Sequence, residues 1–116
     1  MQTDNKSIAH VLNETADLME VQGEDSFRIR SYRRAAETLE SLARQVAAIH
    51  QDEKALLEIP GIGKGMAANI REICSTGKLQ MHQDLLKKYG ATILDLLKLQ
   101  GLGPKTIALI WDSFQV

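Results

Sequence analysis

The sequence predicts an all-α fold, a compact helical bundle. Three observations predict it: apolar residues recur at helical spacing through most of the 116 residues, proline occurs only twice, and β-branched runs are few. Because 44% of the residues are hydrophobic but only 4% are aromatic, the chain can bury a modest core that must be aliphatic. We therefore expect several helices joined by short turns.

The first half of the chain contains two long predicted helices. Asp4 or Asn5 can cap the first helix, and Gly23 ends it at a position that favours a left-handed residue. Ser26 can cap the second helix. The apolar face of this second helix comprises Ile29, Tyr32, Ala35, Ala36, Leu39 and Ala43, with Val46 further on.

The second half is predicted to hold shorter helices. Asp52 opens one that Pro60 ends, and a glycine turn leads to another that Gly77 ends. Two further short helices are expected between residues 81 and 99, and Pro104 suits the first turn of a final helix.

The net charge and the cysteine content limit the classes of function that the sequence allows. The net charge is −1, so no global basic field favours nucleic acid, and any such binding must come from local patches. Cys74 is the only cysteine, which excludes an internal disulfide and favours a reducing compartment. No apolar stretch approaches the roughly 18–20 residues that span a membrane, and the N-terminus shows no signal peptide. We expect a cytoplasmic protein with no membrane partner.

Two glycine turns form an internal repeat. GIGKG at residues 61–65 and GLGPK at residues 101–105 stand in matching segments, LEIPGIGKGMAANI and LKLQGLGPKTIALI, each of which reads as helix, tight turn, helix. Such a turn can require a positive φ, which glycine tolerates and a β-branched residue does not. We therefore expect that Gly63 cannot be replaced by a β-branched residue. The alternative is that the turns merely join helices.

The start of the helix after each turn is a predicted anion site. Its first N–H groups have no intrahelical partner, and the helix dipole adds positive potential there. The candidate phosphate-binding residues are Gly61, Gly63, Lys64, Gly65, Gly101, Gly103 and Lys105. Backbone donors carry no base information, so binding would be independent of DNA sequence.

An arginine cluster follows the start of the second predicted helix, in SFRIRSYRRAA at residues 26–36. Three of its arginines would share a face away from the apolar stripe, and guanidinium groups match phosphate geometry. The candidates are Arg28, Arg30, Tyr32, Arg33 and Arg34. The alternative is a solvated face on which the arginines pair with Glu37 and Glu40. Tyr32 is expected in the core, with its hydroxyl at the surface or in contact with a nucleotide.

Signals for other chemistry are absent from the sequence. The histidines His10, His50 and His82 are scattered, so we expect each at the surface, and no Cys/His spacing suggests a metal site. No Asp-x-Asp pair suggests a two-metal polymerase or nuclease site. We expect no catalytic residues in this chain.

Three segments together resemble a known family. FRIRSYRRAAETLESL, LLEIPGIGKGMAANIREICSTGKL and LLKLQGLGPKTIALIWDSF occur in the order found in the N-terminal part of family X DNA polymerases, and the match is closest to the bacterial type. The resemblance covers residues 5–116. It implies a fold like the N-terminal domain of DNA polymerase beta, with helix-hairpin-helix motifs at residues 57–74 and 93–115.

The resemblance also implies a division of the chain. Residues 1–80 would form an 8-kDa-like domain that holds the downstream side of gapped DNA. Residues 81–116 would begin a second subdomain that holds the primer side. The catalytic palm would follow, so this chain alone is not expected to add nucleotides. The whole protein is expected to be a DNA-directed DNA polymerase, a nucleotidyltransferase of base excision repair.

Further site residues come from the same resemblance. Hairpin carbonyls in the family hold a monovalent cation, K⁺ or Na⁺, against a DNA phosphate. The matching residues here are Leu57, Ile59, Ile62, Leu97, Leu99 and Leu102. We expect no other cofactor.

The lyase lysine of the family, which forms a Schiff base with a 5′-deoxyribose phosphate, is matched by Asn69, which cannot form an imine. Two further family lysines are matched by Gly65 and Met81, whereas Arg28 keeps the charge of another. Tyr32 matches a family tyrosine of the same pocket, and Lys64 could partly replace the missing charge.

The leading hypothesis is a non-catalytic, monomeric module that binds gapped or nicked duplex DNA bearing a 5′-phosphate end, in a bacterial, nucleoid-associated setting. One alternative is a 5′-deoxyribose-phosphate/AP lyase that uses another lysine, Lys64 or Lys78. The other is a helical module that docks a protein.

Overall fold

The computed structural model describes residues 4–90, together with residues 95 and 103. The predicted second hairpin at residues 93–115 therefore lies outside the described residues, apart from Asp95 and Gly103. Within the described part the chain forms helices and no strands, which confirms the predicted all-α class. None of the helices there is both long and apolar enough to cross a membrane.

Two long helices, α1 (Asn5–Gln22) and α2 (Ser26–Ser41), form the first half. The Asp4 carboxylate caps α1 by accepting the Ser7 N–H at 2.8 Å, and Gly23 ends this helix at φ 84°, as predicted. The cap of α2 is Asp25, whose carboxylate accepts the Phe27 N–H at 3.1 Å. The prediction that Ser26 caps α2 was wrong by one position, because Ser26 is already helical.

Shorter helices follow. A 3₁₀ helix, η1 (Val46–Ala48), precedes α3 (Glu53–Leu57), which Asp52 caps as predicted. Gly77 ends α4 (Lys64–Thr76) at φ 77°, and Gly90 ends α5 (Gln80–Tyr89) at φ 78°. The helix ends are therefore placed by local signals: acidic side chains that accept N–H groups and glycines that adopt φ values unfavourable for other residues.

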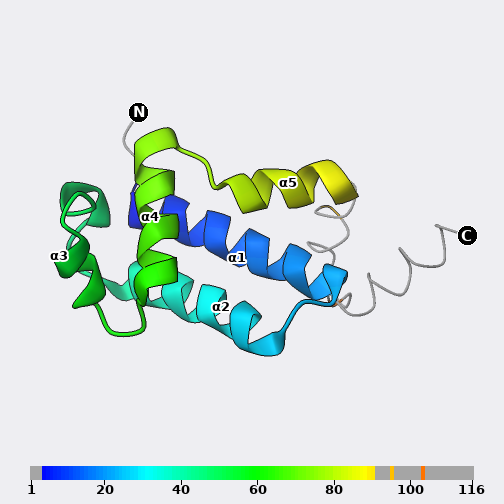
Figure 1. Cartoon of the computed structure of the whole chain (residues 1–116), viewed down its shortest axis with the longest axis horizontal. Helices are drawn as coiled ribbons and strands as arrows, with labels where there is room; N and C mark the ends of the chain where they lie inside the picture. Colours follow the sequence, from blue (N-terminus) through cyan, green and yellow to red (C-terminus); the bar gives the residue numbers. More distant parts are fainter. Residues whose placement is uncertain (1–3, 91–94, 96–102, 104–116) are drawn as a thin grey trace, which may run out of the picture.

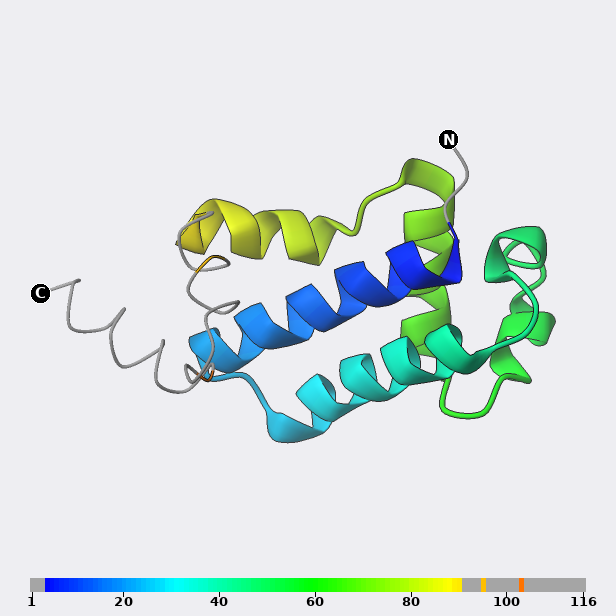
Figure 2. The same ribbon diagram turned by 180° about the vertical axis from the view of Figure 1, so that it is seen from behind.

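The helices pack around α1 (Figure 1). The antiparallel helix α2 lies along one side of α1, and α5 lies along the other side, which both views show (Figure 2). Helix α4 crosses the end of the α1–α2 pair, and α3 packs against α4. This arrangement places the turn between α3 and α4 beside α2.

The core is aliphatic, as predicted. Its largest fully buried side chains include Ile8, Leu12, Leu18, Met19, Leu39, Leu56, Ile70 and Ile73. Burying one such side chain stabilises the fold by about 1.5–3 kcal/mol. Three residues of α5 and its approach, Leu79, Leu85 and Tyr89, belong to the same buried cluster. The predicted division after residue 80 stays a prediction, and α5, which lies beyond it, packs on α1.

A polar contact also joins α5 to α1. His82 is only 7% exposed, and its Nε2 lies 2.8 Å from Glu14 Oε1. His10 Nε2 contacts the other oxygen of the same carboxylate at 3.0 Å. The expectation that His82 lies at the surface was wrong, because α5 turns the face that carries Leu85 and His82 toward α1.

Candidate nucleic-acid interface

The turn between α3 and α4 exposes the start of a helix. Ile59 and Ile62 are buried and anchor the turn in the core, which explains why these positions are apolar. The first bond of α4 runs from the Ala67 N–H to the Gly63 carbonyl at 2.8 Å. Gly63 is the N-cap and has no side chain to bond the earlier N–H groups. The free donors and the positive end of the helix dipole therefore face outward together, which suits an anion.

The two glycines of this turn differ in conformation. Gly61 has φ 86°, a left-handed value that favours glycine, and the Arg34 side chain packs directly over it. Gly63 has φ −93° and ψ −176°, an extended conformation that any residue can adopt, and a Cβ there would meet nothing within 4 Å. The expectation of a positive φ at Gly63 was therefore wrong, and this requirement belongs to Gly61.

A cleft of about 410 Å³ opens beside the start of α4. It is lined by residues of α2, of the turn and of α4: Arg28, Ser31, Tyr32, Gly61, Gly63, Gly65, Met66 and Asn69. Five of the sequence-predicted site residues thus meet around one hollow. Lys64 is exposed at the first position of α4 and is not among the lining residues.

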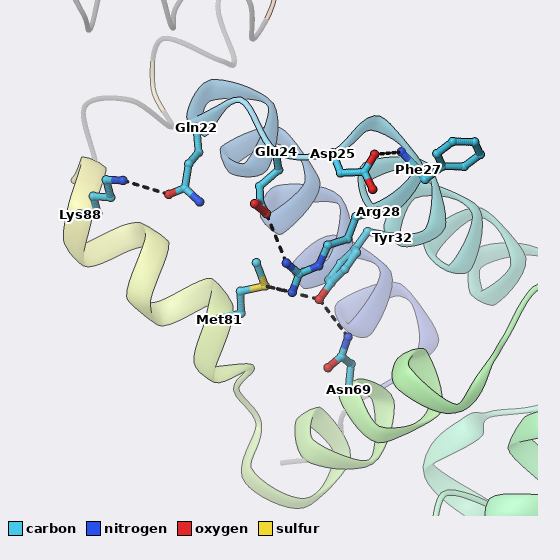
Figure 3. A network of polar contacts seen from close by, with 9 residues as sticks. All are labelled: Gln22, Glu24, Asp25, Phe27, Arg28, Tyr32, Asn69, Met81 and Lys88. Atoms are coloured by element: carbon cyan, nitrogen blue, oxygen red, sulfur yellow. Dashed lines mark hydrogen bonds and ion pairs between the residues drawn. The ribbon is translucent and has the colours of Figure 1, made fainter.

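Polar contacts hold the side chains at the edge of this cleft (Figure 3). Asn69 Nδ2 donates to the Tyr32 hydroxyl at 3.0 Å, and this hydroxyl donates to Met81 Sδ at 3.5 Å. Arg28 Nη2 also lies 3.5 Å from Met81 Sδ, and Arg28 Nη1 pairs with Glu24 at 3.3 Å. The side chain of Arg28 is 52% exposed, so this ion pair is weak and leaves the guanidinium accessible to an anion.

A second hollow of about 250 Å³ adjoins the first and shares Ser31 and Gly61 with it. Its other lining residues are Phe27, Arg30 and Arg34. Phe27 is 73% exposed, and the Arg30 guanidinium lies 4.8 Å from the centre of its ring. Within the described part of the chain, Arg30 and Arg34 form no ion pair. Phe27 was not among the site residues predicted from the sequence. Its position outside the apolar stripe of α2 was the available signal, because an aromatic side chain there is expected to be exposed.

Arg33 differs from the other arginines of the cluster. Its Nη2 bonds Asp17 at 2.8 Å and Glu20 at 2.6 Å, both carboxylates of α1. Partial burial works to lower the pKa of Arg33, but the bonds to Glu20 and Asp17 outweigh it and raise this pKa above its usual value. Arg33 therefore joins α2 to α1, and it lines a separate hollow of about 420 Å³ together with Arg30, Glu20 and Glu24. The alternative prediction, that the arginines pair with Glu37 and Glu40, is also wrong for Arg33, whose partners are Asp17 and Glu20.

The cleft offers no amine for imine chemistry among its described lining residues. Asn69, which the resemblance matches to the family's lyase lysine, donates its amide N–H to the Tyr32 hydroxyl. The described residues also contain no group of three or more His, Cys, Asp or Glu side chains that could hold a metal ion. Of the residues proposed to bind a monovalent cation, Leu97, Leu99 and Leu102 lie outside the described residues, as do Gly101 and Lys105.

A family model and two known proteins match most of this chain. A family model described as a helix-hairpin-helix domain matches residues 3–79, and the chain belongs to this family. Two relatives are DNA polymerases. The chain is 33% identical over 117 residues to the DNA polymerase/3′-5′ exonuclease PolX of Bacillus subtilis (strain 168), a match that covers 96% of the chain and 19% of that protein. It is 28% identical over 110 residues to the DNA polymerase lambda of Arabidopsis thaliana, covering 94% of the chain and 20% of that protein.

The predicted resemblance to family X DNA polymerases is confirmed by these matches. The chain spans about a fifth of the length of both relatives.

Proposed function

We propose that this chain binds DNA without sequence preference, as a monomeric DNA-binding part of a family X repair polymerase. Its substrate is gapped or nicked duplex DNA, and the cleft beside α4 receives the 5′-phosphate end. The observation that carries the proposal is the meeting of the uncapped start of α4 with Arg28 and Tyr32 around one cleft. Membership of the helix-hairpin-helix family and the similarity to two DNA polymerases support it.

The cleft suits a terminal phosphate for two reasons. The N–H groups at the start of α4 can donate to phosphate oxygens, and the half-exposed Arg28 can add a charge-assisted bond. A 5′-terminal phosphate carries more negative charge than an internal phosphodiester, so these donors bind it more strongly. None of them reads a base edge, which makes the binding independent of sequence.

The second hollow suits the DNA next to a 5′ end. In a gap the template bases lack partners, so their faces can stack on an aromatic side chain. Phe27 is exposed and its ring lies beside Arg30, which adds positive charge near the adjoining phosphates. We propose that Phe27 stacks on an unpaired base while Arg30 and Arg34 contact the backbone.

Backbone carbonyls of the turn are proposed to hold K⁺ or Na⁺ when DNA is bound. The carbonyl of Ile59 accepts the Ile62 N–H at 3.1 Å and keeps a second lone pair for a cation. Carbonyl oxygens can replace the hydration shell of such an ion. Leu57 and Ile62 would supply the further ligands. Replacing KCl by tetramethylammonium chloride at equal ionic strength should then weaken DNA binding, and equal affinity in both salts would argue against this cation site.

The proposed function is tested by fluorescence anisotropy with short-gapped duplexes that carry either a 5′-phosphate or a 5′-hydroxyl group. We expect about tenfold tighter binding to the phosphate, the equivalent of one charge-assisted hydrogen bond. Doubling the salt concentration should weaken binding about sixfold if about three phosphates are contacted. Equal affinity for the two ends would refute end recognition, and salt-independent binding would refute phosphate binding altogether.

A matched pair of variants assigns the effect to the cleft. Arg28→Ala should remove most of the preference for the 5′-phosphate. Arg71→Ala removes an exposed arginine from α4, but position 71 lies about 200° around the helix from Asn69, which lines the cleft. It should leave the preference unchanged, and equal losses in both variants would mean that only overall charge matters.

A further inference from the structure

Met81 places a sulfur atom against the two strongest side-chain donors of the cleft. Its Sδ lies 3.5 Å from Arg28 Nη2 and 3.5 Å from the Tyr32 hydroxyl (Figure 3). The donors come from α2, whereas Met81 comes from α5. A thioether sulfur is a weak acceptor. Both donors can therefore leave it for a phosphate oxygen, which is charged and a much stronger acceptor.

Oxidation of Met81 would reverse this preference of the two donors for a phosphate oxygen over the Met81 side chain. We propose that Met81 is a redox-sensitive modification site that controls anion binding in the cleft, an inference that rests on the proposed function. The oxidant is a hydroperoxide, and a sulfur lone pair attacks its terminal oxygen. An S–O bond forms as the O–O bond breaks, the sulfur is oxidised by two electrons, and the peroxide is reduced to water or an alcohol.

The product binds the two donors more strongly than the thioether does. A sulfoxide oxygen carries partial negative charge and is a strong acceptor. Because it is bonded to Sδ, it needs only a small adjustment to come within hydrogen-bond distance of Arg28 and Tyr32. The oxygen then occupies the donors that the phosphate would use, and its charge repels the incoming anion.

The exposure of the methionines favours reaction at this position. Met19 is fully buried, and Met66, which lines the cleft, is only 7% exposed. Met81 is half-buried, which makes it the most accessible of the three methionines within residues 4–90. Methionine oxidation follows access to the sulfur.

The test compares native protein and a Met81→Leu variant before and after treatment with hydrogen peroxide. Mass spectrometry of peptides locates the added oxygen atom, and far-ultraviolet circular dichroism shows that the fold persists. Affinity is measured for the gapped duplex with a 5′-phosphate and with a 5′-hydroxyl group. Oxidation of Met81 should weaken binding to the 5′-phosphate duplex about five- to tenfold, the loss of about one charge-assisted bond. Methionine sulfoxide reductases should restore it.

The variants give the result its specificity. Met81→Leu, which offers no acceptor, should bind equally well before and after peroxide. Met81→Gln places an amide oxygen near the same donors and should reproduce the weakened binding without an oxidant. The redox inference is wrong, while end recognition stands, if oxidation of Met81 leaves the preference for the 5′-phosphate intact. It is also wrong if peroxide removes this preference from Met81→Leu as much as from the native protein. If the untreated protein shows no phosphate preference, both proposals are wrong.

Discussion

Replacing Gly61 by alanine should destabilise the protein, because two costs meet at this position. At φ 86° an alanine occupies the left-handed region, which costs about 1–2 kcal/mol. Its Cβ would also lie 3.2 Å from Arg34 Cδ and 3.3 Å from Arg34 Cγ, so the arginine stem must shift by a few tenths of an ångström. The stem is flexible, and its shift adds little. We therefore expect the free energy of unfolding to fall by about 1–2 kcal/mol, which lowers the Tm by about 5–10 °C.

Two further glycines provide the controls. Gly77 has φ 77°, and a Cβ there would meet nothing within 4 Å, so Gly77→Ala carries the backbone cost without the contact to Arg34. Gly65 is the second residue of α4 and has no positive φ, and a Cβ there would meet nothing within 4 Å, so Gly65→Ala should not lower the free energy of unfolding. Urea unfolding followed by circular dichroism measures all three variants.

The DNA affinity separates the Arg34 contact from the backbone cost. Gly61→Ala should weaken DNA binding because it displaces Arg34, whereas Gly77→Ala should not. Equal stability of native protein and Gly61→Ala would refute the left-handed turn. A loss on Gly65→Ala as large as that on Gly61→Ala would also refute it.

Three further predictions follow from the cleft and its surroundings. Arg33→Ala should lower the free energy of unfolding by about 1 kcal/mol, since two carboxylates lose their partner at a half-exposed site. It should change DNA affinity less than Arg34→Ala does, as comparison of the two variants in urea unfolding and anisotropy would show. Borohydride trapping on DNA with a 5′-deoxyribose phosphate should give no adduct with the native chain but an adduct with Asn69→Lys, which brings an amine to the cleft. Burial raises the pKa of the Cys74 thiol, so it should react with iodoacetamide more slowly than glutathione does at neutral pH, and unfolding in urea should remove the difference.

Local signals in the sequence predicted most helix ends. Asp4 and Asp52 accept N–H groups at helix starts, and Gly23 and Gly77 adopt left-handed values at helix ends. Each of these interactions joins residues at most four positions apart, so the neighbouring residues in the sequence are enough to predict each helix end. The start of α2 differed by one residue because Asp25 and Ser26 are both good capping residues and stand side by side.

Contacts between helices were harder to predict. Periodicity indicates which residues share a face of a helix, but it does not say what another helix places opposite that face. Arg33 shares a face with Arg30 in the sequence pattern, yet it meets Asp17 and Glu20 of α1. His82 is buried for the same reason, since its partner Glu14 lies in α1. Among the candidate site residues, Gly61, Gly63 and Gly65 lie together around the cleft because they belong to one turn and the helix start after it.

The net charge of −1 does not argue against DNA binding once the charges are located. The carboxylates of Asp17 and Glu20 are bonded to Arg33 on the α1–α2 contact, and the carboxylate of Glu14 contacts His82 on the α1–α5 contact and His10 within α1. These acidic groups are therefore paired with other side chains, whereas Arg30 and Arg34 form no ion pair with any described residue. A phosphate near the start of α4 lies within about one Debye length of this unpaired charge at physiological salt, so the local field decides the binding. A protein of this kind can stay close to neutral and still present a basic face, provided that part of its acidic charge is held in ion pairs with other side chains.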